Sequence, residues 1–391
     1  MYAYTRKFHE VELKTSPSAY GEIMTVELNP VIQADFNYGV NGELFDSATN
    51  SGVVETINSN LCLRCSGSAG SFAEIKTKKL IRYRPGQGNG IRFSAIFTEG
   101  SSGTKQLYGV GDSNDGYFVG FNGTKFGVLR RSFGAEHWTY QEDFNVDKLD
   151  GQANSQFKYF PSKGNVFDIQ YQWLGYGSIV FNIENPETGL FMPFHRIQYS
   201  NTATSPSTEF GSNPILLRVE TNETTTNPPT LRGASLFGYL EGQLVYTGPK
   251  FGANNAVVGI GTSQQNILTL KNELVFKTKQ NKISTKTEGL SFSAEGSQPV
   301  TVQIRKNATI GGSPVFNPIG VDSVISKDIA GTSVTGGTLL ASFTLNKVGS
   351  IFISKADFET FLSPGETLTF SAAVSGGTST VVASVNWVED H

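Results

Sequence analysis

Cysteine and methionine are scarce in this chain of 391 residues, which contains 2 Cys and 3 Met. The two cysteines form one Cys-x-x-Cys motif, Cys62 and Cys65, so a framework of several disulfides is excluded. A Ser/Gly turn follows the motif where a redox dithiol would open a helix, and the sequence nearby offers no further zinc ligands. We therefore expect two buried thiols with a structural role.

Long hydrophobic runs and an excess of basic charge are also missing. No stretch approaches the roughly 18 apolar residues of a transmembrane helix, so we expect no membrane insertion. The first ten residues lack the apolar core of a signal peptide, which favours synthesis and assembly in a cytoplasm. A net charge of −3 and an isoelectric point near 5.9 are opposite to what nucleic-acid binding requires.

Catalytic motifs are missing as well. The sequence has no Gly-x-Ser-x-Gly, no phosphate-binding loop and no dinucleotide fingerprint, and its 4 His show no metal-binding spacing. A glycosidase needs two carboxylates at a set separation, and nothing selects a pair among 34 Asp and Glu. We assign no catalytic residue, no metal and no cofactor, and we expect a protein that is not an enzyme.

Short alternating segments separated by turn residues fill most of the chain. Residues 107–129 are typical, because apolar and small residues alternate there and are interrupted by Asp-Gly and Asn-Gly, which suit hairpin turns. The composition of 43 Gly, 28 Phe and 14 Tyr fits sheets with many corners. The sequence predicts an all-β protein.

The strand pattern predicts two β-sandwich, jelly-roll-like domains after an extended N-terminal segment. Residues 1–78 form the anchoring segment, 79–250 a large sandwich with ten candidate strands, and 257–391 a smaller sandwich. A Pro, Gly and Asn cluster over residues 249–256 marks the boundary. We expect one short helix, which Ser354 caps and Pro364-Gly365 ends.

The candidate ligand-binding residues lie between residues 136 and 150, which we expect to form a loop. Tryptophan beside carboxylates is common where proteins bind sugars, because the ring stacks on the sugar while the carboxylates accept hydrogen bonds from its hydroxyls. The residues of this stretch that suit such a site are Trp138, Glu136, Asp143 and Asp147. A packing or subunit-contact role for Trp138 is the alternative that we favour, because Tyr140 and Phe144 supply a small apolar cluster beside it.

A second acidic group, Asp112, Asn114 and Asp115, has some of the oxygen ligands of a calcium loop. It lacks the twelve-residue spread of ligands that ends in a bidentate Glu. We interpret it as a hairpin turn made of ordinary turn residues.

Several sequence segments resemble those of a family of virion structural proteins found in tailed phages and large double-stranded DNA viruses. These segments are residues 81–98, 109–129, 138–151 and 165–185, with further ones at 305–312, 331–337 and 384–390. The resemblance covers most of residues 75–391 and contains no catalytic fingerprint. It implies a virion component associated with the capsid, a vertex or a fibre.

From this resemblance we expect a non-enzymatic virion structural protein that contacts other virion proteins. The N-terminal segment has few regular strands to bury its Phe and Tyr residues, which favours a homo-oligomer, and a trimer is our expectation. The alternative is an adhesin, a tail fibre or spike receptor-binding protein that recognises a host-surface carbohydrate. The sequence does not choose among capsid, vertex, tail and fibre.

Overall fold

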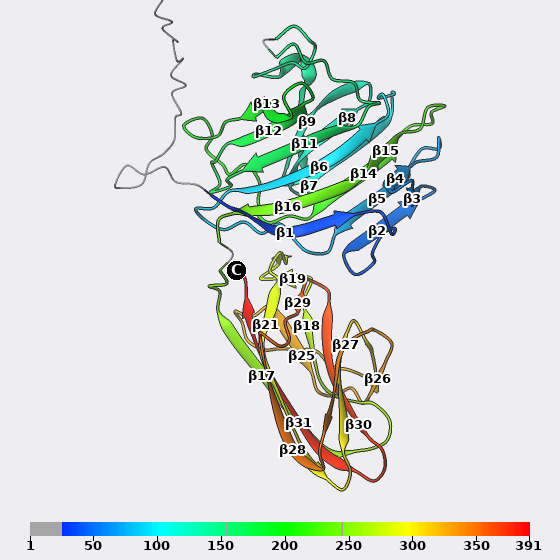
Figure 1. Cartoon of the computed structure of the whole chain (residues 1–391), viewed down its shortest axis with the longest axis vertical. Helices are drawn as coiled ribbons and strands as arrows, with labels where there is room; N and C mark the ends of the chain where they lie inside the picture. Colours follow the sequence, from blue (N-terminus) through cyan, green and yellow to red (C-terminus); the bar gives the residue numbers. More distant parts are fainter. Residues whose placement is uncertain (1–25, 154, 244) are drawn as a thin grey trace, which may run out of the picture.

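The computed structural model describes residues 26–153, 155–243 and 245–391 (Figure 1). Within these residues the chain forms 31 strands and no α-helix, and its one short helix is the 3₁₀ turn η1 (Gln141–Asp143). None of the described segments is a helix with the length and apolar character needed to cross a membrane. The strands build sandwiches of antiparallel sheets around two hydrophobic cores, so the prediction of an all-β, β-sandwich fold is confirmed.

A nine-stranded sheet lies on one side of the first core. Its main path runs in the order β13-β12-β11-β6-β15-β4-β3, while β16 pairs with both β6 and β1. Its strands are β1 (Leu28–Asp35), β3 (Val53–Ile57), β4 (Asn60–Arg64), β6 (Asn89–Phe97), β11 (Asn165–Tyr171), β12 (Ile179–Asn185), β13 (Leu190–Ile197), β15 (Thr230–Gly233) and β16 (Ser235–Glu241).

A seven-stranded sheet in the order β10-β9-β8-β7-β14-β5-β2 covers the other side of this core. Its strands are β2 (Phe45–Asn50), β5 (Ser71–Thr77), β7 (Thr104–Gly111), β8 (Gly116–Asn122), β9 (Lys125–Ser132), β10 (Ala135–Tyr140) and β14 (Ile215–Thr221). Between the sheets, the rings of Phe93 on β6 and Tyr108 on β7 stack with centroids 3.9 Å apart. One face of each sheet therefore forms the core, and the other face is free for a different role.

Residues 28–77 differ from the separate extended segment that we predicted for residues 1–78. They form β1 to β5, which pair with strands as distant as β14 and β16 and contribute to both sheets of the first sandwich. Phe36, Phe45 and Leu61 from this stretch are buried in the core. The sequence hides this because strands such as β2 leave most of their residues exposed, and only pairing with β5 orders them. Residues 1–25 of the predicted segment lie outside the described residues.

The second sandwich packs a five-stranded sheet, β17-β31-β21-β28 with β29 beside β21, against a six-stranded sheet in the order β24-β25-β18-β30-β22-β27. The five-stranded sheet contains β17 (Lys250–Ile260), β21 (Thr285–Gly296), β28 (Val348–Ser354), β29 (Phe361–Leu362) and β31 (Ser379–Glu389). The six-stranded sheet contains β18 (Gln265–Asn272), β22 (Val300–Lys306), β24 (Asn317–Pro318), β25 (Ile325–Asp328), β27 (Thr338–Leu345) and β30 (Thr367–Val374). Two small ribbons are added by β19 (Val275–Phe276) with β20 (Lys279–Gln280), and β23 (Thr309–Gly311) with β26 (Ser333–Thr335).

Two details of the second sandwich differ from the sequence expectations. The Gly- and Asn-rich stretch at 249–256 is not a linker, because β17 begins at Lys250 and places Phe251 against the buried Trp387. The short helix expected after Ser354 is a single turn. Ser354 Oγ and Asp357 Oδ2 do approach to 2.7 Å, but β29 then pairs with β21 and takes the chain into the sheet.

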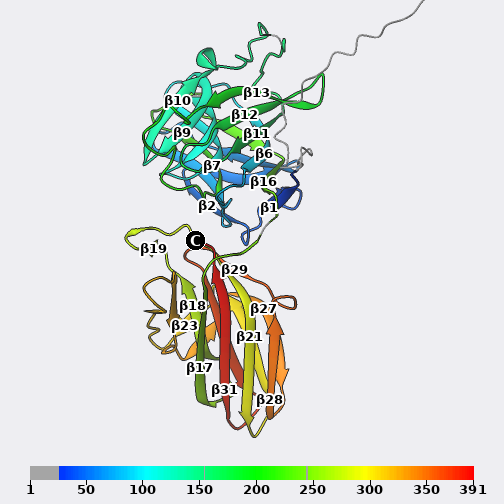
Figure 2. The ribbon, with the colours of Figure 1, turned by 90° about the vertical axis from the view of Figure 1, so that its left-hand side faces the viewer.

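The two sandwiches meet end to end (Figure 2). Charged side chains connect them at this junction. Arg82 and Arg84 of the first sandwich both bind the carboxylate of Asp390, at 2.6 and 3.0 Å. At the same junction, Lys282 of the second sandwich forms an ion pair with Asp112, and their side chains are only 7% and 13% exposed. A buried pair of this kind is costly to break, because removing one partner leaves the other charge without compensation.

We expect Lys282→Met to destabilise the junction by about 3 kcal/mol, because Asp112 is then left buried without its cation. Calorimetry on the full chain should show one sandwich unfolding at a lower temperature than in the parent protein. The matched control is Lys279→Met, which removes a more exposed ion pair across the same junction, with Glu209 at 2.8 Å, and should change the free energy of unfolding by less than about 1 kcal/mol. Equal losses in the two variants would contradict this account.

Candidate functional site

The outer face of the seven-stranded sheet carries a row of charged side chains. Because side chains alternate along each strand, the residues between core positions on β5, β7, β9, β10 and β14 point away from the core. Six of them form what we call the charged row: Glu74, Lys105, Arg131, Glu136, Arg218 and Glu220. The strand register places opposite charges side by side, as for Glu220 and Lys105, which are direct partners of β14 and β7.

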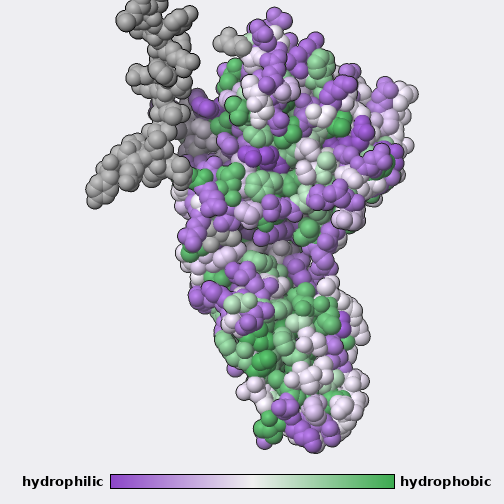
Figure 3. Space-filling view, viewed as in Figure 1, coloured by the Kyte–Doolittle hydropathy of each residue, from purple (hydrophilic) through white to green (hydrophobic). Residues whose placement is uncertain are grey.

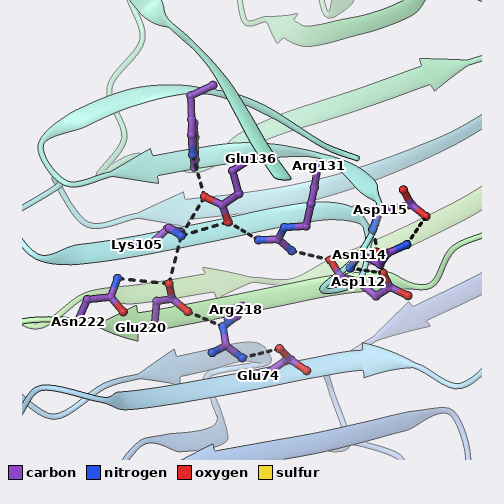
Figure 4. Close-up of polar contacts among 11 residues, drawn as sticks. Glu74, Lys105, Asp112, Asn114, Asp115, Arg131, Glu136, Arg218, Glu220 and Asn222 are labelled. Atoms are coloured by element: carbon purple, nitrogen blue, oxygen red, sulfur yellow. Dashed lines mark hydrogen bonds and ion pairs between the residues drawn. The ribbon is translucent and has the colours of Figure 1, made fainter. Parts of the chain in front are cut away.

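Ion pairs join the charged row across the sheet (Figure 4). Lys105 Nζ lies 3.0 Å from Glu136 Oε2 and 3.3 Å from Glu220 Oε1. Arg131 binds Glu136 at 2.7 Å, and Arg218 lies 2.7 Å from both Glu220 and Glu74. Three carboxylates therefore balance three cations, and the row as a whole is neutral.

Two carboxylates of the row, Glu136 and Glu220, are held in the ionised form. Partial burial alone would raise the pKa of Glu136, but hydrogen bonds from Arg131 and Lys105 outweigh burial, and the pKa lies below its usual value. The same balance holds for Glu220, where Arg218 and Lys105 overcome the effect of burial and lower the pKa. Both groups are therefore acceptors of hydrogen bonds at neutral pH, and neither keeps a proton to donate.

A cleft of about 510 Å³ lies over the charged row, and all six of its members line the cleft. The second sandwich forms part of the wall through Leu274, Asn281, Lys282 and Pro364. The floor of the cleft is thus the polar sheet face of one domain, and residues of the other domain border it. Its shape depends on the junction between the sandwiches as well as on the sheet.

Trp138 stands beside the cleft on β10, on the same face as Glu136. Its ring is half-buried against a small apolar cluster on the outer face of the sheet, formed by Leu107, Phe118, Leu129 and Leu216. The indole Nε1 donates a hydrogen bond to Glu136 Oε2 at 3.2 Å, and the ring is stacked nearly parallel to that of Tyr140. One interaction thus links an aromatic ring to the polar floor of the cleft.

The structure brings together half of the ligand-binding residues that we predicted from sequence. Glu136 and Trp138 are neighbours, but they lie on strand β10 and not in the loop that we expected. Asp143 is exposed in η1, and its carboxylate takes no part in the charged row. Asp147 is buried and stabilises its own loop, accepting hydrogen bonds from the Leu149 N–H at 2.8 Å and Ser155 Oγ at 2.6 Å.

The surroundings of Trp138 combine a feature expected for packing with one expected for ligand binding, the two roles that we considered. The ring packs on an apolar cluster, as a structural residue does, but its N–H reaches a carboxylate that lines the cleft and not a backbone carbonyl. Sequence reasoning missed Lys105, Arg218 and Glu220, which lie far from Trp138 along the chain. In the sequence these residues alternate with apolar residues, which indicates that they point away from the core. The alternation does not indicate which strands are neighbours in the sheet.

The Asp112, Asn114 and Asp115 group occupies the turn between β7 and β8. Asp112 Oδ1 accepts the backbone N–H groups of Asn114 and Asp115 at 2.8 and 3.1 Å, while Oδ2 faces Lys282. Asp115 is fully buried and accepts backbone N–H groups of residues 209 and 210. The carboxylate oxygens of this group thus accept hydrogen bonds from N–H donors, as in a turn. The described residues contain no cluster of three metal-ligating side chains.

The two cysteines lie on and just after β4. Both are free and buried, and burial raises the pKa of the Cys62 thiol and of the Cys65 thiol. A raised pKa keeps a thiol protonated and weakly reactive. This environment suits packing and not redox chemistry.

Comparisons with known proteins identify no family: no protein-family model and no curated protein sequence matches the chain. Solved structures that match part of the chain include an endo-acting O-glycanase of the human gut microbiota, at 12% identity and a TM-score of 0.37 over 54% of this chain and 99% of that one. A pseudo β-1,3-glucanase of Mycobacterium tuberculosis matches at 10% identity and 0.36 over 55% and 100%. The Emp46p carbohydrate recognition domain matches at 7% and 0.34 over 55% and 98%. These values are too low to assign an activity.

We expect Lys105→Met to raise the pKa of Glu136 and Glu220 toward their usual value of 4.5, because both lose a cation. A lowered pKa contributes stability that is present above pH 4.5 and is lost as the pH falls through the folded-state value. The free energy of unfolding of the variant should therefore be about 2 kcal/mol lower than that of the parent protein at pH 7. This difference should become smaller at pH 3. Denaturant unfolding at the two pH values measures this.

The control for this measurement is Lys125→Met, which breaks the exposed pair of Lys125 with Glu142 at 2.6 Å. We expect its effect at pH 7 to be small, because water screens exposed pairs. A Lys105→Met loss of equal size at pH 7 and pH 3 would contradict the electrostatic origin.

Proposed function

We propose that this protein is a non-enzymatic carbohydrate-binding protein that takes a neutral glycan in the cleft over the charged row. The observation that carries the proposal is the single arrangement of a half-buried Trp138 ring, hydrogen-bonded to Glu136, at the border of a polar cleft of about 510 Å³. Sugars combine apolar ring faces with hydroxyls that both donate and accept hydrogen bonds. An aromatic ring beside paired charged groups meets both requirements.

The neutral balance of the charged row favours an uncharged ligand. Lys105 and Arg131 offer N–H donors, while Glu136 and Glu220 offer acceptors, and each already has an opposite charge beside it. A charged ligand would have to break these pairs, whereas a hydroxyl can add a hydrogen bond to a carboxylate that keeps its cation. A neutral glycan is therefore the class of ligand that this floor recognises at the lowest cost.

The protonation states of three acids that line the cleft favour binding without hydrolysis. Glycoside hydrolysis requires one carboxylic acid that keeps its proton near neutral pH, usually through a raised pKa. Among the acids of the cleft, Glu136, Glu220 and Asp112 have lowered pKa values, because cations and hydrogen bonds outweigh burial. These three side chains lack the proton that a general acid must supply. We therefore propose a binding role.

Trp138→Ala should weaken glycan binding at least tenfold, a loss of about 1.4 kcal/mol, because the stacking surface is removed. A glycan array with neutral and acidic glycans identifies the ligand, and calorimetric titration compares the variants. His137→Ala is the matched control, since His137 is exposed on the opposite face of β10. Unchanged thermal stability would separate loss of binding from loss of packing. No glycan bound by the parent protein, or equal affinity in Trp138→Ala, would overturn the proposal.

We propose a virion component as the second candidate, with the glycan site serving as a receptor-binding surface. The sequence resemblance supports it, and so does an apolar edge of the second sandwich that is suited to assembly. The two proposals are compatible, because a fibre or spike both builds the particle and binds a host surface. Contacts with other virion proteins and a location in the particle belong to this second proposal.

If the second proposal holds, particles purified from the virus that encodes the chain contain it as a stoichiometric component. Mass spectrometry gives its copy number, and antibody labelling in electron micrographs gives its position. Many copies over the shell indicate a capsid role, while a few at vertices or tails indicate a spike or fibre. Particles without the chain would contradict the virion assignment and leave the glycan-binding test unaffected.

A further inference from the structure

Several edge strands in this protein are protected against pairing with another chain. Strand β13, at one end of the nine-stranded sheet, contains Pro193 and has a bulge at Phe194. Strand β24 ends the six-stranded sheet with two residues, one of them Pro318, and β17 has a bulge after Val257. Proline, bulges and short length are the usual means by which edge strands avoid association.

Strands β27 and β28 lack most of this protection. They are the terminal strands of the six-stranded and five-stranded sheets, and one tight turn joins them, so both open edges lie on the same side of the second sandwich (Figure 2). From residue 338 to residue 354 the sequence has no proline and no acidic residue, and its one charge is Lys347 in the turn. The pairing of β27 with β22 has one irregularity, but β28 pairs with β21 in an unbroken register.

Large apolar side chains are exposed along this edge. Val348 is 74% exposed, Phe352 is 70% exposed, and Leu339 on the neighbouring strand is exposed as well. Half-buried Phe343 and Ile351 continue the surface toward the core. Hydrophobic residues gather on the side of the second sandwich where β27 and β28 lie (Figure 3). A contiguous apolar patch beside an open strand edge marks a contact surface.

We propose that β28 pairs antiparallel with β28 of a second copy of this chain, so that the two five-stranded sheets join into one across a two-fold axis. Residues 348–354 include no charged side chain, so any antiparallel register brings no like charges together. A two-fold contact requires a surface complementary to itself, and a regular, uncharged, apolar strand edge satisfies that requirement. The trimer that the sequence favours is replaced here by a dimer, because one β28 edge accepts one partner strand.

Two features of the β28 edge favour a β-strand as its binding partner. The carbonyl of Ser354, at the end of β28, accepts the backbone N–H groups of Asp357 and Phe358. The other outward N–H and C=O groups of β28 have no backbone partner within the described part of the chain, and a second strand supplies partners for them. Joining the edges also buries the exposed Phe352 and Val348 side chains of both copies. Hydrogen bonding and apolar burial therefore favour the same contact.

Light scattering and analytical ultracentrifugation on the full chain test the proposal. The parent protein should be a dimer at micromolar concentration, and Phe352→Lys should raise the dimer dissociation constant at least tenfold by placing like charges near the joined edges. Val258→Lys is the matched control, because Val258 is 80% exposed on β17, the opposite edge of the same sheet. The control should remain dimeric, and all proteins should have the same circular dichroism spectrum.

Hydrogen exchange supplies a second measurement that does not depend on the variant. Amides of β28 should become more protected as the concentration rises through the dissociation constant, while amides of β17 should not change. A parent protein that stays monomeric at 100 μM, an oligomer other than a dimer, or a dimer that Phe352→Lys leaves intact would overturn the proposal. Glycan binding in the cleft is measured separately and does not enter these outcomes.

Discussion

The period-two alternation of strands β7, β9 and β14 gives the seven-stranded sheet two chemically different faces, and the rest of the first domain depends on it. Tyr108 and Leu217 point inward and pack in the core, while Lys105 and Glu220 of the same strands point outward and form ion pairs. Neither face is stable without the other, because a shift of register by one residue would bury the charges and expose the rings. The core and the cleft are two results of one constraint.

The junction between the sandwiches turns this face into a site. Without the second domain, the charged row would be an open polar surface of the kind that many sheets present to water. The ion pair between Lys282 and Asp112 holds residues such as Leu274 and Asn281 at the border of the sheet and encloses the space above it. The shape of the cleft, and with it the proposed binding of a glycan, therefore depends on the arrangement of the domains.

The two domains use their outer surfaces differently. The first sandwich pairs its outward charges with one another, which leaves a neutral polar floor suited to hydroxyl groups. The second sandwich places uncharged and apolar residues such as Phe352 at an open edge, which suits a protein strand. This division fits a molecule in which one domain recognises a ligand and the other assembles, as the proposed functions require.

The sequence by itself determined the all-β class, about half of the strands and two separate cores, because alternation and turn residues are local properties of the chain. It also identified Glu136 and Trp138, which are close in sequence and share one face of β10. Only the tertiary structure decided that residues 28–77 belong to the first sandwich and that Lys105, Arg218 and Glu220 join Glu136. The physical reason is that antiparallel pairing between distant strands, such as β5 with β14, is set by long-range register and not by any local pattern.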